Sequence, residues 1–172
     1  FFFLGSFVSS FLVELISQKT ERNIYALPTS IEILILLIIG ILGGDLILNN
    51  PDIVACSLLF AMGLQNSLVT KISNATVRTT HLTGLFTDLG IELSQLFFYK
   101  AAEKKQKLFS SIKLRMTIIS FFFIGGVVGG ICYTKIQLKV LVIASLALIV
   151  GLIYDNIKLK IVLFNRKYHS ES

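Results

Sequence analysis

The sequence has 172 residues and a net charge of +6, with 54% hydrophobic and 15% charged residues and a mean hydropathy of +0.80. Soluble domains carry about 25% charged residues, and a soluble core of this size would leave large apolar patches in water. The composition therefore excludes an ordinary soluble domain. It predicts an all-α, polytopic bundle of about six transmembrane helices, with the lipid bilayer as its main partner.

The expected helices are stretches of about 20 mostly apolar residues, the length that crosses a bilayer. Pro51 is well placed for a helix start. Because Phe1 begins inside an apolar run, the first helix is shortened and the sequence is expected to be a fragment. In chain order the expected helices are Phe1–Ile16, Ile31–Leu48, Ile53–Ile72, His81–Phe98, Met116–Tyr133 and Leu138–Ile157.

An internal repeat is indicated by two pairs of matching segments. FFFLGSFVSSF at residues 1–11 matches FFFIGGVVGGI at residues 121–131, and residues 36–42 match residues 147–153. A duplication of this kind occurs in many transporters. It predicts that residues 1–48 are the C-terminal helix pair of a truncated first repeat and that residues 53–157 are a complete second repeat. About 65–70 residues would then precede Phe1, counted by the repeat logic of transporter folds.

Small residues one helical turn apart occur in the repeated helices. Such rows let two helix backbones approach closely in lipid, so they predict helix-packing faces, through which the chain could also form a homo-oligomer. The pairs are Gly5 with Ser9, Ser6 with Ser10, Gly40 with Gly44, Gly125 with Gly129, and Gly126 with Gly130.

Positive charge is concentrated in residues 100–115, which hold five lysines and Arg115 against Glu103. No pattern of a nucleic-acid-binding module accompanies them, so no nucleic-acid partner is expected. The positive-inside rule predicts that this segment is a cytoplasmic loop and that the basic tail, residues 158–172, is also cytoplasmic. Lys135 and Lys139 would then face outward, in mild conflict with the rule.

Catalytic and metal-binding motifs are absent from the sequence. There is no P-loop, HExxH or GxSxG motif, so no enzymatic activity, metal or cofactor is expected. Cys56 and Cys132 lie in apolar segments without CxxC spacing or neighbouring histidines. They are predicted to be buried free thiols.

The most polar stretch between the apolar helices runs from residue 61 to residue 95. Ionisable side chains at membrane depth are costly and indicate a functional site. On a helix, His81, Asp88, Glu92 and Gln95 fall on one stripe. The predicted substrate or ion site consists of Gln65, Asn66, Arg78, Thr79, Thr80, His81, Thr83, Asp88 and Glu92.

Each part of this site has a functional and a structural interpretation. Asp88 or Glu92 could titrate in a proton- or cation-coupled site, or the stripe could be a polar packing seam with Glu92 near the headgroups. Arg78 beside a helix N-terminus could attract an anion or form an ion pair with one of the two carboxylates. Gln65 and Asn66 could contact a ligand or hydrogen-bond to another helix.

The run GLQNSLVTKISNATVRTTHLTGLFTDLGIEL resembles the hallmark of the YoaK-like family of bacterial multi-pass membrane proteins, whose function is unknown. The matching motifs are residues 63–66, 78–84 and 87–93. A Gly/Asp stretch followed by Thr-Gly-Asn, usual in the first half of the family, does not occur here. The resemblance implies a protein of the bacterial inner membrane and supplies no substrate.

Two functions follow from these patterns. The first is a small-molecule or ion transporter whose site is the polar stretch, with Arg78, Asp88 and Glu92 binding or coupling charge. The second is a non-transporting membrane scaffold or regulatory subunit, in which the same side chains hold helices together. Charge counting does not decide whether the repeats are parallel or inverted.

Overall fold

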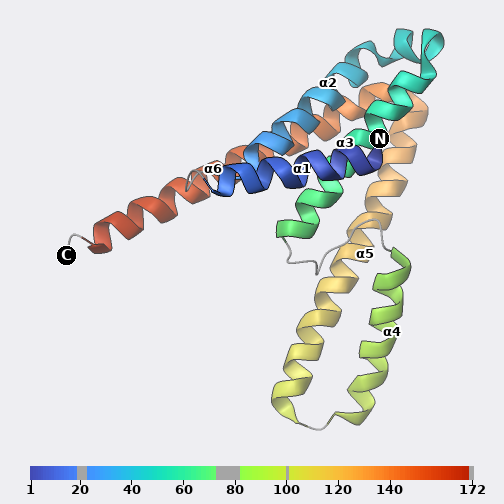
Figure 1. Ribbon diagram of the computed structural model, residues 1–172. Helices are drawn as coiled ribbons and strands as arrows, with labels where there is room; N and C mark the ends of the chain where they lie inside the picture. Colours follow the sequence, from blue (N-terminus) through green and yellow to red (C-terminus); the bar gives the residue numbers. More distant parts are fainter. Residues whose placement is uncertain (19–22, 73–81, 100, 171–172) are drawn as a thin grey trace. The chain divides into compact units, whose positions relative to one another are not determined.

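The computed structural model describes residues 1–18, 23–72, 82–99 and 101–170 (Figure 1). Every regular element in these ranges is helical, so the all-α prediction is confirmed. The elements are α1 (Phe2–Ser17), α2 (Ala26–Asn49), α3 (Pro51–Ile72), α4 (Leu82–Phe98), α5 (Ala102–Ile136), the 3-10 turn η1 (Gln137–Lys139) and α6 (Val140–Ser170).

Three described stretches are long and apolar enough to cross a membrane: α2, α3, and residues 102–158, which include α5, η1 and most of α6. Helix α1 is a shorter apolar helix. Large apolar side chains are exposed along these helices, for example Phe3 at 76% and Ile41 at 67%. Side chains of this kind need an apolar solvent, which identifies a membrane protein. The number of crossings expected from the sequence stays a prediction.

The basic segments are helical where the sequence predicted a loop and a tail, and the predicted loop is wrong. Residues 102–115, predicted as a loop, form the first turns of α5, and α6 continues through most of the predicted tail to Ser170. The segment AEKKQKL is made of strong helix formers. Glu103 and Lys107 add an ion pair of 3.2 Å at i,i+4 spacing, which supports a helix.

The chain divides into two compact units, residues 1–68 with 133–172, and residues 69–132. This division does not follow the predicted repeats, which stay a prediction. In the first unit, α2 lies along α6 in antiparallel orientation: Gly40 faces Val142, and Asn23 Nδ2 donates to Asn156 Oδ1 at 3.1 Å. Gln137, with φ of 50°, stands in the left-handed region where α5 ends and the chain turns toward α6.

Helices α1 and α3 cross at two glycines. A Cβ on Gly5 would overlap the carbonyl oxygen of Phe60, and a Cβ on Gly63 would overlap the carbonyl oxygen of Phe2. Ser6 Oγ donates to the Gly63 carbonyl at 3.1 Å. The predicted packing face at Gly5 is therefore confirmed, because only glycine lets the two backbones approach this closely.

The other predicted packing faces differ in whether their glycines contact a neighbouring helix. Gly40 packs against α6. Gly44, predicted to lie on the same packing face, has no neighbour within 4 Å of a built Cβ. Gly43 packs against Leu138 instead. The four α5 glycines of the predicted rows, Gly125, Gly126, Gly129 and Gly130, also have open space at this position.

Candidate functional site

The candidate site lies in the second unit, on the antiparallel pair formed by α4 and α5 (Figure 1). Leu85 and Leu89 of α4 are buried against Ile119 of α5. These leucines are four residues apart and thus share one face of α4. Partly buried Leu82, Ile112 and Ile118 surround this small core. It fixes the register that brings the polar side chains of the two helices together.

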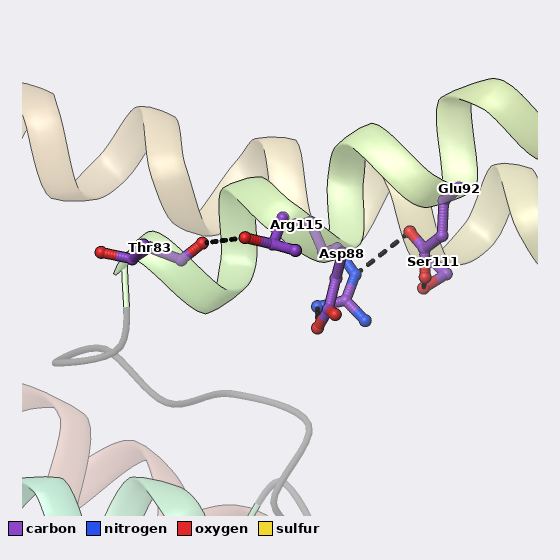
Figure 2. A network of polar contacts seen from close by, with 6 residues as sticks. Thr83, Asp88, Glu92, Ser111 and Arg115 are labelled. Carbon is purple, nitrogen blue, oxygen red and sulfur yellow. Dashed lines mark hydrogen bonds and ion pairs between the residues drawn. The ribbon is translucent and has the colours of Figure 1, made fainter.

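One arginine joins both carboxylates of the predicted stripe (Figure 2). Arg115 Nη1 donates to Asp88 Oδ2 at 2.9 Å, and Arg115 Nε donates to Glu92 Oε2 at 3.1 Å. Ser111 Oγ donates to the other Glu92 oxygen at 2.6 Å. The predicted carboxylates are thus brought into one network, and its centre is a residue of α5.

The two carboxylates differ in their surroundings. The side chains of Arg115 and Glu92 are 17% and 15% exposed, whereas that of Asp88 is 52% exposed. Glu92 has a bond on each oxygen, and Asp88 is held by one guanidinium nitrogen. Two carboxylates share one guanidinium, so these three residues carry one surplus negative charge. Glu92 is therefore the more firmly held carboxylate, and Asp88 is the more accessible one.

The network lies where α5 changes from polar to apolar. Residues 102–115 include six charged side chains, whereas residues 116–134 include none. At 1.5 Å per residue this uncharged run is about 28 Å long, close to the thickness of a bilayer's hydrocarbon core. Arg115 immediately precedes it. The network therefore lies at one end of the apolar run rather than at its middle.

The other predicted site residues have different outcomes. Thr83 lies in the first turn of α4, where its carbonyl accepts a bond from Thr87 Oγ1 at 2.9 Å, outside the network (Figure 2). Gln65 and Asn66 lie in α3, in the first unit; Gln65 Oε1 is buried with no hydrogen-bond partner in the described part of the chain. Arg78, Thr79, Thr80 and His81 lie outside the described residues.

Sequence reasoning missed three residues. The sequence prediction placed Arg115 and Ser111 in a loop. They are nevertheless four residues apart, as Asp88 and Glu92 are, so each pair lies on one face of its helix and the two faces can meet when the helices pack in antiparallel orientation. The third is Glu32, a carboxylate in the apolar part of α2. It is 6% exposed, and its Oε2 has no partner among the described residues. Ionisable residues inside a membrane helix indicate a functional site.

Glu32→Leu is expected to raise the midpoint of thermal unfolding in detergent, because it removes a buried polar atom that lacks a partner. The free energy of unfolding should increase by about 1–2 kcal/mol. Asp45→Leu, at an exposed position of the same helix, should change the midpoint little. A lower midpoint for Glu32→Leu than for the native chain would show that Glu32 has a stabilising partner.

A cavity of about 420 Å³ in the first unit involves none of the predicted site residues. It is lined by Phe1, Ile35, Asp52, Ile53, Cys56, Ser57 and Phe60. Cys56 and Cys132 are free and partly exposed, so the prediction that they are buried is wrong. Among the described residues, no group of three His, Cys, Asp or Glu side chains is placed to hold a metal ion.

Comparison with known proteins gives one family. The family described as "Protein of unknown function (DUF1275)" matches residues 1–154. No curated protein and no solved structure matches the chain. The family match is consistent with the resemblance to the YoaK-like family, and that narrower name stays a prediction.

Proposed function

The chain belongs to the DUF1275 family, whose function is unknown, and we propose that it is a small-molecule or ion transporter of the bacterial inner membrane. The observation that carries the proposal is the network of Asp88, Glu92 and Arg115, in which one guanidinium serves two carboxylates. A site with one surplus negative charge attracts a proton or a cation.

The unequal burial of the two carboxylates suggests how the site would work. A cation arriving at half-exposed Asp88 would compete with Arg115 for Oδ2. Arg115 would then be held by Glu92 alone, and Ser111 would keep Glu92 in place through its 2.6 Å bond. The cation would thus change the pairing between α4 and α5, which is the kind of differential contact that links binding to a conformational change.

Buried polar atoms in the first unit also support transport. Ser9 Oγ of α1, Glu32 Oε2 of α2 and Gln65 Oε1 of α3 are all buried without a partner in the described part of the chain. Membrane helices normally satisfy such atoms internally. Gln65, and the predicted lining residues Asn66, Arg78, His81 and the threonines, belong to this proposal as substrate contacts.

Asp88→Asn is expected to reduce cation flux at least tenfold, because it removes the surplus charge while preserving the shape of the side chain. The measurement uses the full chain in liposomes, with a sodium-sensitive dye and a pH-sensitive dye inside. Glu103→Gln is the matched control, since Glu103 is an exposed carboxylate whose partner is Lys107. Unchanged flux in Asp88→Asn, or absence of flux of both ions in the native chain, would contradict the proposal.

A second candidate function is a non-transporting scaffold or regulatory subunit. The pairing of both Glu92 oxygens favours it, because a fully bonded ion pair can simply hold two helices together. In that case Asp88→Asn would lower the thermal stability of the chain, and no flux would depend on it.

Several features of the proposal come from the sequence alone. They are the internal duplication, the cytoplasmic position of residues 100–115 and of the C-terminus, and the homo-oligomer. The glycines of α5 are suited to the last of these, since a Cβ at Gly125, Gly126, Gly129 or Gly130 would meet open space. We expect no enzymatic activity, cofactor or nucleic-acid partner.

A further inference from the structure

The end of the α4–α5 pair near residue 100 combines exposed aromatic rings with exposed lysines. Phe97 and Phe98 are 88% and 80% exposed, and Phe109 is 58% exposed. Lys104 Nζ lies 5.6 Å from the centre of the Tyr99 ring. We call this region the hairpin tip. Its described residues are 97–99, which include the last two residues of α4, and 101–113, which include the first turns of α5.

The hairpin tip is strongly positive. Lys104, Lys105, Lys107 and Lys113 are exposed, and Glu103 is its only described acidic side chain, which leaves an excess of three positive charges. Glu103 pairs with Lys107 while both remain almost fully exposed, at 84% and 79%. Arg115 is excluded from this count because the site carboxylates hold it. No described acidic side chain pairs with the other three lysines.

The lysines stand close to the membrane along the same helix. They precede the uncharged run that begins at Met116 by 3 to 12 residues, or about 5–18 Å along a helix. The headgroup layer extends about 6 Å beyond the hydrocarbon core, and the potential of an anionic surface reaches about 8 Å further. A lysine cluster immediately outside a spanning helix is typical of anionic-lipid binding.

The aromatic rings extend this argument. Large apolar side chains left in water need a partner, and amphipathic or aromatic side chains favour the membrane–water interface. Phe97 and Phe98 are next to the lysines, at the end of α5 that lies about 21 Å from Met116 along the helix, so both groups reach the headgroups together only if the hairpin bends over toward the bilayer. We propose that the hairpin tip binds the surface of anionic phospholipids, through Lys104, Lys105 and Lys107 and by insertion of Phe97 and Phe98.

The test uses a single tryptophan as a depth probe, because the chain has none of its own. The full chain carrying Phe98→Trp is reconstituted into vesicles of phosphatidylcholine, or of phosphatidylcholine mixed with phosphatidylglycerol. The acyl chains are brominated near the headgroup. We expect the quenching of tryptophan fluorescence to be at least about threefold stronger with phosphatidylglycerol. Removing the lysines by K104Q/K105Q/K107Q should abolish the difference.

Two controls and one repeat measurement make the result specific. Phe121→Trp, in the apolar run of α5, should be quenched equally in both vesicles. Lys135→Gln, at the opposite end of that run, should leave the Phe98→Trp result unchanged. Phe97→Trp repeats the measurement if Phe98→Trp does not fold, as judged by circular dichroism.

Two outcomes would overturn the proposal. Equal quenching in both vesicle types would show that the tip does not recognise headgroup charge. Absence of quenching, with a blue shift of emission that grows with the ratio of protein to lipid, would show that a second copy of the chain covers the tip.

Discussion

Replacing Arg115 by leucine is expected to lower the free energy of unfolding by about 3 kcal/mol. The substitution keeps an apolar stem but leaves Glu92, whose side chain is 15% exposed, without its cation. An unpaired buried charge costs more than the ion pair contributes. Titration with denaturing detergent, followed by circular dichroism, measures the change.

Double-mutant cycles measure how much of this loss of unfolding free energy comes from the pairing of Arg115 with Glu92 and how much comes from its pairing with Asp88. We expect the coupling of Arg115 to Glu92 to exceed its coupling to Asp88, because the Asp88 side chain is 52% exposed and solvent weakens its pairing. The Glu103–Lys107 pair, exposed on both sides, serves as the control and should show no measurable coupling. Equal coupling of Arg115 to both carboxylates would refute the distinction between a fixed Glu92 and an exchangeable Asp88.

Gly5→Ala is expected to be the most damaging small substitution in the first unit. Its added Cβ would occupy the position of the Phe60 carbonyl oxygen, and backbone atoms cannot move aside as a flexible side chain can. Overpacking of this kind costs about 1–3 kcal/mol and occasionally more. Gly63→Ala should have a similar effect, because its Cβ would meet the Phe2 carbonyl oxygen.

Gly125→Ala is the matched control, since Gly125 is the counterpart of Gly5 in the predicted repeat. A Cβ at Gly125 meets open space, and alanine favours a helix over glycine by up to about 1 kcal/mol. Its thermal midpoint should therefore stay equal or rise. A similar midpoint for Gly5→Ala and Gly125→Ala would mean that the crossing of α1 and α3 is not close-packed in solution.

Local pattern was sufficient for the helices and insufficient for some of their ends. Pro51 begins α3 as predicted, because proline fits the first turn, where its missing N–H has no partner to lose. The start of α5 was placed 14 residues too late, at Met116 instead of Ala102. Hydropathy detects the apolar run, but a helix continues into charged residues when these are strong helix formers.

Only the α4 residues of the candidate site could be predicted from the sequence. Asp88 and Glu92 stand out in the sequence because they share a face of an otherwise apolar helix. Arg115 gives no such signal, since its charge merges with five neighbouring lysines. The burial of Glu32 could not be predicted from the sequence either, because carboxylates near the ends of helices also occur at exposed positions.

The sequence by itself determined that this is an all-α membrane protein with an acidic stripe, because composition and helical periodicity depend only on the order of side chains. The tertiary structure decided which cation joins the two carboxylates. It also decided which glycines bring backbones together: Gly5 and Gly63 do, whereas Gly125 does not. Pairing depends on the register of α4 against α5, and that register is set by the contacts of Leu85 and Leu89 with Ile119.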